Sequence, residues 1–260
     1  MKPVPKLLQF SLIGAALFGA VAASQAATVR VVFDSNIFED APNPDNVSIT
    51  YPGLGVGAPR ETAATAAGRF QGTVLEYSGV PLTIFVDGLN DLYMYCYDVY
   101  EHIWGGKDLT YTINLVGESA RTLDFLGAVN DELNKSNAKY DQYAWLHPAN
   151  GYVAAAIQLG IWESKYDIDA NGWDLANGLF SATGIADGTN QTESYLSRFI
   201  AAIGSSASLD GRFVMTLEND GFQDMITGDP PGSVPEPGTL GLLAAAGLGL
   251  LAARRKTPSA

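Results

Sequence analysis

The sequence predicts an α+β domain: a mostly antiparallel β-sandwich or barrel with an inserted helical subdomain. Alternating apolar side chains near the start, at Val29, Val31 and Phe33, are typical of half-buried strands. Apolar side chains at helical spacing first appear after residue 118, and a strand-like run returns near residue 212. Strands before and after a helical stretch therefore indicate helices inserted into a β domain.

The first half of the chain contains the expected strands. Segments Thr28 to Phe33, Gly72 to Tyr77 and Leu82 to Val86 have strand-like patterns with Gly and Pro between them. The aromatic run from Leu92 to Tyr100 continues this pattern. Residues 41–68 are rich in Pro, Gly, Ala and Thr without a steady period, so we expect a long loop there.

The second half contains the expected helices, two of which follow good N-cap residues. The apolar side chains at 123, 125, 126, 129 and 133 predict a helix from Ser119, the cap, to Asn134. A second helix is expected from the Asn150 cap to about Ser164, and a third over Glu193 to Ile203. Arg212 to Leu217 is expected to be the closing strand.

The N-terminus has the composition of a secretory signal peptide. Lys2 and Lys6 precede an apolar run from Leu7 to about Ala23, and Ser24-Gln25-Ala26 offers small residues for cleavage. We therefore assign residues 1–26 to a signal peptide and expect an exported protein.

The C-terminus contains three segments in a fixed order. Val234-Pro235-Glu236-Pro237-Gly238 is followed by a charge-free stretch from Thr239 to Ala253 and then by Arg254-Arg255-Lys256. This arrangement resembles the PEP-CTERM sorting signal of Gram-negative bacteria, which the membrane peptidase exosortase recognises and cleaves. The resemblance assigns residues 233–260 to sorting, with Pro235, Glu236 and Pro237 as the motif and exosortase as a partner.

The length of the apolar stretch favours a transient inner-membrane anchor. Its 15 residues form at most about 22 Å of helix, which is shorter than the ~30 Å hydrocarbon layer. The basic end would stay on the cytoplasmic side and leave the Pro-Glu-Pro motif outside. An ordinary single-span anchor is the alternative. After sorting we expect the protein at the cell surface or in the extracellular matrix.

Residues 27–232 remain as one domain of strongly acidic character. They keep 10 of the 15 basic and 27 of the 28 acidic residues, a net charge of −17. Such a charge repels nucleic acid and anionic lipid, so neither is expected as a partner.

Cys96 is the single cysteine of this exported chain. It cannot form an internal disulfide, so it is inert in a core, paired with another chain, or chemically special. In a strand, the side chains of Leu92, Met94 and Cys96 share one face, which we expect to be buried.

Gln158 interrupts the otherwise apolar helical stretch Ala156 to Glu163. A primary amide buried there costs about 1–3 kcal/mol unless its hydrogen bonds are satisfied. The Tyr95-Cys96-Tyr97 context, together with Gln158 and the Ile161-Trp162 pair that follows it, resembles the bacterial thioester domain of adhesins. That resemblance implies a bond between the Cys96 thiol and the Gln158 side chain, formed with release of ammonia. Gly160 departs from the thioester-domain pattern, because alanine or another good helix former is expected at this position.

The resemblance implies covalent capture of amine-bearing surface or matrix molecules, in adhesion or a biofilm matrix. Amine attack on the thioester is acyl transfer used once, so the protein is not expected to be an enzyme or to need a cofactor. Candidates to shield the bond are Tyr95, Tyr97, Trp162 and Trp145, although as core aromatics these four need no special role. The side chains that could assist proton transfer are Asp98, His147 and His102.

Two other functional classes remain open. A thiol hydrolase would use Cys96 as nucleophile and His147 as base, although papain-type enzymes place the thiol at a helix N-terminus and Cys96 is expected within a strand. A passive extracellular matrix protein would contain an inert, buried Cys96.

A possible calcium loop begins at Asp167. Asp167, Asp169 and Asn171 supply oxygen ligands at alternate positions, followed by Gly172, as in the first half of an EF-hand loop. The twelfth position is Gly178 instead of glutamate. We therefore expect an acidic turn and no metal site.

Overall fold

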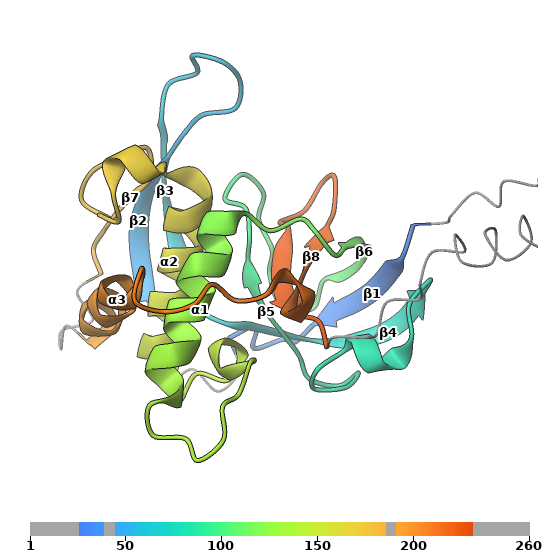
Figure 1. Cartoon of the computed structure of the whole chain (residues 1–260). Coiled ribbons are helices and arrows are strands. Elements are labelled where there is room, and N and C mark those ends of the chain that lie inside the picture. The colour runs from blue at the N-terminus through green and yellow to red at the C-terminus, as the bar shows by residue number, and fades with distance from the viewer. Residues whose placement is uncertain (1–25, 39–44, 186–190, 231–260) are drawn as a thin grey trace, which may run out of the picture.

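The computed structural model describes residues 26–38, 45–185 and 191–230 (Figure 1). Apart from Ala26, the predicted signal peptide lies outside these residues, as does the predicted sorting signal. Within the described part of the chain, no helix has both the length and the apolar character needed to cross a membrane.

The predicted α+β fold class is confirmed, and the larger sheet is a closed six-stranded barrel of antiparallel neighbours in the order β1-β4-β5-β9-β8-β6. Val29, Val31 and Phe33 of β1 are fully buried, as their alternation predicted. The barrel strands are β1 (Thr28–Phe33), β4 (Phe70–Ser78), β5 (Leu92–Cys96), β6 (Asp108–Asn114), β8 (Val214–Glu218) and β9 (Met225–Gly228).

A second, three-stranded sheet occupies the segment that we predicted to be a loop. It has the order β3-β2-β7 and consists of β2 (Asp45–Tyr51), β3 (Glu61–Ala67) and β7 (Ser181–Thr183). The loop prediction for residues 41–68 was therefore wrong. Val47, Ile49 and Tyr51 alternate as buried residues in β2, whereas β3 is built from Ala and Thr, whose small side chains give no hydrophobic period.

The helices α1 (Ala120–Asn134), α2 (Gly151–Tyr166) and α3 (Gln191–Ala202) pack against one another. In Figure 1, α1 and α2 lie between the small sheet and the barrel. The predicted caps are confirmed, because the Ser119 side chain accepts from Thr122 N and the Asn150 side chain from Val153 N. Helix α2 is buried on nearly every side, which places Gln158 in the interior of the protein.

Other element boundaries differ from the predictions. Leu82 to Val86 is not a strand, because Leu82–Ile84 forms a 3-10 turn after Pro81. The strand predicted over Leu92 to Tyr100 ends at Cys96, and the closing strand begins at Val214 after a 3-10 turn, η4 (Gly211–Phe213). Strands β6, β7 and β9 were not predicted, although Leu109, Tyr111 and Ile113 alternate within β6.

Gly160 allows the two central helices to approach closely. A Cβ atom at this position would lie 1.9 Å from Cζ of Phe125, whose ring lies directly on the backbone of α2. The glycine that departs from the thioester-domain pattern is therefore required by the packing of α1 on α2.

We predict that Gly160→Ala lowers the free energy of unfolding by about 1–3 kcal/mol, because the Phe125 ring must move to admit a methyl group. Urea unfolding followed by circular dichroism measures this change. Gly221→Ala is the control, since its Cβ would meet only Asn219 Oδ1 at 4.0 Å. Equal stability of the two variants would contradict the packing argument.

Candidate functional site

The site begins at Cys96, the last residue of β5. Its side chain is 1 % exposed. On one edge of the strand, β9 pairs with β5 through Cys96 and Met225. On the other edge, β4 begins at Phe70, which is opposite Met94. The backbone of Cys96 therefore extends past the end of β4 and, among the residues that the structure describes, has no strand partner on that side.

The carboxamide of Gln158 occupies this vacant strand position. The Cys96 N–H donates to Gln158 Oε1 at 2.9 Å, and Gln158 Nε2 donates to the Cys96 carbonyl at 2.8 Å. Both bonds are buried, and Gln158 is fully inaccessible to solvent. The amide thus forms the pair of hydrogen bonds that an adjacent strand residue would form.

The two residues identified from the sequence therefore lie in direct contact, although they are 62 positions apart in the chain. The Cys96 thiol belongs to the same residue whose N–H and carbonyl group bind the Gln158 carboxamide. The same two bonds also satisfy the buried amide without a covalent link.

Burial controls the chemistry of the thiol. Desolvation, together with the negative charge of Asp98, raises the pKa of Cys96 well above its ordinary value. The thiol is therefore protonated at neutral pH, unlike the activated thiolate of a cysteine hydrolase.

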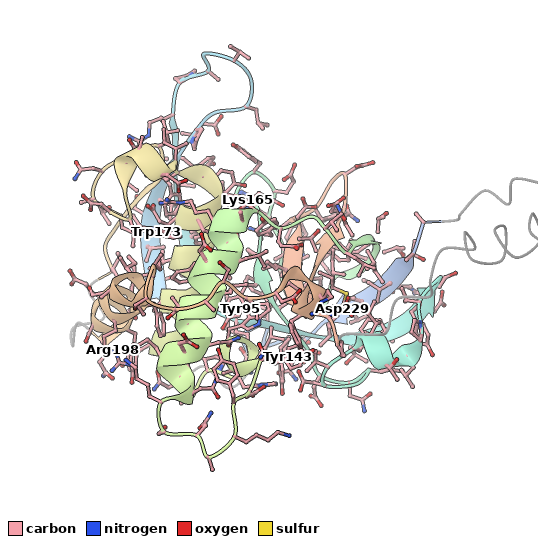
Figure 2. All side chains as sticks on the ribbon, in the orientation of Figure 1. Tyr95, Tyr143, Lys165, Trp173, Arg198 and Asp229 are labelled. Carbon is pink, nitrogen blue, oxygen red and sulfur yellow. The ribbon has the colours of Figure 1, made fainter. Side chains whose placement is uncertain are left out.

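The two tyrosines that flank Cys96 point to the opposite face of β5 from the thiol, as strand alternation requires. Tyr95 stacks on Trp145 at a centroid distance of 5.9 Å and donates to the Trp145 carbonyl at 3.0 Å. Tyr97 reaches the start of α1, where its hydroxyl accepts from Ser119 N at 2.9 Å. Figure 2 shows Tyr95 where β5 meets the helices. These rings fill the layer between β5 and the helices and do not lie over the thiol itself.

Trp162 lies one turn beyond Gln158 on α2 and is 1 % exposed. Its ring packs near Phe180 with a centroid distance of 6.4 Å. It therefore helps to bury α2 on the side of the small sheet.

His147 is placed away from the thiol. Its Nε2 lies 3.0 Å from Asp87 Oδ1, and its ring packs edge-on against Tyr93. Tyr93 shares the strand face of Tyr95, so His147 lies on the opposite side of β5 from the Cys96 thiol. The structure does not bring together the nucleophile and base that a thiol hydrolase requires, and His102 is exposed in the β5–β6 loop.

The acidic loop after α2 encloses an internal cation. The Arg121 guanidinium contacts Asp169 Oδ1 at 2.8 Å and Glu163 Oε1 at 3.4 Å, and it stacks on Trp173 at 3.8 Å. Asp167 Oδ1 accepts from Ile168 N, Leu179 N and Asn171 Nδ2, which closes the loop. In residues 26–38, 45–185 and 191–230, no group of three or more His, Cys, Asp or Glu side chains is arranged to hold a metal.

Our sequence analysis did not identify Arg121 and Glu163 as partners. The available signal was Glu163 itself, a carboxyl group within the apolar stretch of α2 that would require a partner once buried. Burial, followed by the charge of Asp167, raises the pKa of Glu163 to about 7. Glu163 Oε2 and Asp167 Oδ2 are both buried, and neither has a hydrogen-bond partner within the described part of the chain.

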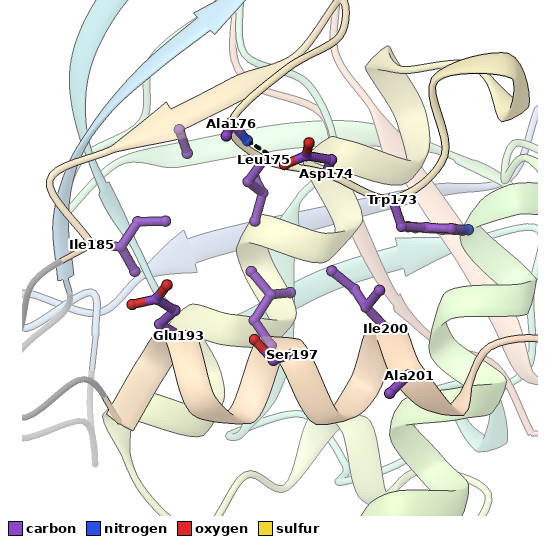
Figure 3. Close-up of a pocket in the computed structure, with 11 residues that line it drawn as sticks. Trp173, Asp174, Leu175, Ala176, Ile185, Glu193, Ser197, Ile200 and Ala201 are labelled. Atoms are coloured by element: carbon purple, nitrogen blue, oxygen red, sulfur yellow. Dashed lines mark hydrogen bonds between the residues drawn. The ribbon is translucent and has the colours of Figure 1, made fainter.

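A pocket of about 380 Å³ lies beside α3 (Figure 3). Leu175, Leu196 and Ile200 form apolar walls, and Asp174 and Glu193 supply carboxylates. Cys96 and Gln158 do not line this pocket.

Comparison with known proteins identifies one segment of the chain. Residues 233–256 match the PEP-CTERM protein-sorting motif, in agreement with the sequence prediction. The protein is therefore exported and sorted, and the motif implies processing by exosortase. No curated protein and no solved structure matches the chain.

Glu163 should make stability depend on pH. Its pKa is raised from 4.5 to about 7 on folding, so its stabilising contribution is complete below pH 4.5 and is lost as pH rises through 7. In wild type, the free energy of unfolding should fall by at most about 1.4 kcal/mol per pH unit as Glu163 ionises. The Glu163→Gln side chain stays neutral, so this variant should not show the decrease. Urea unfolding at several pH values, with the exposed Glu193→Gln as control, measures the difference. Parallel pH profiles for wild type and Glu163→Gln would contradict the prediction.

Proposed function

We propose that residues 27–232 form a thioester domain in which Cys96 Sγ is bonded to the side-chain carbonyl carbon of Gln158. The observation that supports this proposal is the pairing of the Gln158 carboxamide with the N–H and C=O of Cys96. The Cys96 backbone holds the Gln158 carboxamide in a buried site before any bond forms, which would lower the entropic cost of the reaction.

The hydrogen bonds are suited to the condensation. The thiol sulfur attacks the carboxamide carbon, the C–N bond breaks, and ammonia leaves with the proton of the thiol. The Cys96 N–H, 2.9 Å from Gln158 Oε1, stabilises the negative charge that develops on this oxygen. In the product it would continue to polarise the thioester carbonyl.

The thioester would then capture amines. A primary amine attacks the same carbon, the C–S bond breaks, and a secondary amide and a free Cys96 thiol result. Complete burial of Gln158 keeps bulk water from hydrolysing the bond before an amine enters. The reaction occurs once per molecule and does not turn over.

This chemistry suits the export of the protein. A signal peptide over residues 1–26 and a sorting signal over 233–260 would deliver the domain through a transient inner-membrane stage to the cell surface or the extracellular matrix. There it would attach covalently to amine-bearing surface or matrix molecules, in adhesion or in a biofilm matrix.

A passive matrix protein is the second candidate, and one observation favours it. The hydrogen bonds to Cys96 give each polar atom of the Gln158 side chain a partner, and burial keeps the thiol protonated and unreactive. The thiol hydrolase has weaker support, because His147 lies on the wrong face of β5.

We predict that the secreted mature domain is lighter than its sequence mass by one ammonia. Intact mass spectrometry under acidic denaturing conditions measures the deficit, and Cys96→Ala and Gln158→Glu should both abolish it. Full sequence mass together with one alkylatable thiol in undamaged wild-type protein would exclude the thioester and favour the passive protein.

We also predict that methylamine reacts with the folded domain, frees the Cys96 thiol and labels Gln158. Peptide mapping identifies the labelled residue. Gln223, which is also buried but bonds to the Asp98 carbonyl, provides an internal control and should remain unlabelled. An ammonia deficit without methylamine labelling would mean that the bond is a structural cross-link and not a reactive hook.

A further inference from the structure

Asp98 is the acidic side chain held next to the reacting cysteine. It is 5 % exposed and lies two residues after Cys96. Its Oδ1 accepts from Tyr100 N at 3.1 Å and Glu101 N at 3.4 Å, and its Oδ2 accepts from Asp224 N. These bonds fix the carboxylate between the end of β5 and the start of β9, at the end of the barrel where the thiol lies.

The thiol and this carboxylate lie on the same side of the chain, because Tyr97 N between them still donates to the Asp224 carbonyl at 2.7 Å and residues two apart in an extended segment share one face. Asp98 is the charged group that, after burial, raises the pKa of Cys96. Tyr111 on β6 is fully buried, and its own pKa is raised by burial and then by Cys96, Asp224 and Asp98. Hydrogen bonds also link Tyr111 to this region, since its hydroxyl donates to the Gln223 carbonyl at 3.3 Å and Gln223 Nε2 donates to the Asp98 carbonyl at 2.8 Å.

Of the other candidate bases in the described residues, the two histidines lie elsewhere. His147 is bonded to Asp87 on the far face of β5, and His102 is exposed. Lys165 is a cation whose Nζ lies 3.8 Å from the centre of the Tyr97 ring. Several titratable groups face Asp98, both from its own strand and loop and from the elements packed against it. They are Cys96, Tyr100, Glu101, Tyr111, Lys165, Tyr166 and Asp224.

We propose that Asp98 carries the proton between the Cys96 sulfur and the amine nitrogen, both when the thioester forms and when an amine opens it. This role rests on the proposed thioester function. In formation, the carboxylate takes the thiol proton as the S–C bond forms and returns it to the departing nitrogen, which leaves as ammonia. In capture, the amine loses a proton to the carboxylate as the C–S bond breaks, and that proton passes to the sulfur.

Asp98 can transfer the proton in both reactions, because amine capture is the reverse of condensation with a primary amine in place of ammonia. The pKa of Asp98 is raised to about 6, chiefly by burial. The group is therefore mostly ionised at neutral pH, yet basic enough to accept a proton in a dry site. A thiol whose own pKa is raised requires such an acceptor.

Refolding provides a direct test. Chain recovered denatured from inclusion bodies retains the free thiol and the Gln158 amide, so dilution from denaturant starts condensation. Intact mass at timed intervals gives the rate of ammonia loss from pH 5 to 8. With Asp98 as acceptor, the rate should level off above about pH 7 and fall below pH 6.

Asp98→Asn preserves the size of the side chain and one acceptor oxygen but cannot take the proton. We expect its condensation rate at pH 7 to fall by about 10²-fold or more and to rise steadily with pH because hydroxide replaces the carboxylate. Asp98→Glu should restore part of the rate and the plateau. Asp224→Asn, which removes a neighbouring carboxylate, is the matched control and should change the rate less than about threefold.

The outcomes separate the two proposals. No ammonia loss in wild type at any pH would overturn the thioester function and the role of Asp98 together. Ammonia loss at equal rates in wild type and folded Asp98→Asn would overturn the role of Asp98 alone. If Asp98→Asn does not fold, the wild-type profile decides, because a rate that rises steadily from pH 5 to 8 without a plateau contradicts a carboxylate acceptor.

Discussion

The pair of hydrogen bonds between the Gln158 carboxamide and the Cys96 backbone is the contact on which the rest of the structure depends. Strand β4 begins at Phe70, opposite Met94 and two residues short of a position opposite Cys96, so a buried N–H and a buried carbonyl would otherwise have no partner. Each such group costs about 1–3 kcal/mol when left unsatisfied. A glutamine on α2 supplies both partners, which ties the helical layer to the barrel at one defined register. The close approach of α1 to α2 at Gly160 belongs to the same arrangement, since it packs the Phe125 ring on the helix that carries Gln158.

The contact that completes the sheet is also the arrangement that a Cys–Gln condensation needs. The Cys96 N–H, which has no strand neighbour to bind, points at Gln158 Oε1, where negative charge would develop. Burial makes these hydrogen bonds necessary and also excludes water from the carboxamide. The apparent obstacle is the thiol, because the same burial keeps it protonated. A buried carboxylate two residues away offers a route for its proton, which is why Asp98 becomes important in this account. The acidic character of the domain would also favour the approach of cationic amines over anionic surfaces.

Much of this site could be predicted from the sequence, because the signals were local. An unpaired cysteine in an exported chain and an amide within an apolar helix each require an explanation, and the Ser119 and Asn150 caps located both central helices. The small sheet was missed because β3 is made of Ala and Thr, whose size hides any alternation. The roles of Tyr95 and Tyr97 could not be deduced, since which strand face meets the helices is decided by tertiary packing. Likewise, the ion pair between Arg121 and Asp169 of the acidic loop could not be predicted, because the two residues are 48 positions apart in sequence and leave no local pattern.

The most direct test of the central claim is to isolate the joined peptides. Trypsin should release residues 70–107, which contain Cys96, and residues 140–165, which contain Gln158. Digestion at mildly acidic pH, followed by fragmentation mass spectrometry, should yield these two peptides as one species whose mass is their sum less one ammonia, with the bond at Cys96 and Gln158. Recovery of the two peptides only as separate species, with a free thiol on one and an intact glutamine on the other, would contradict the thioester and leave Gln158 as a structural bridge.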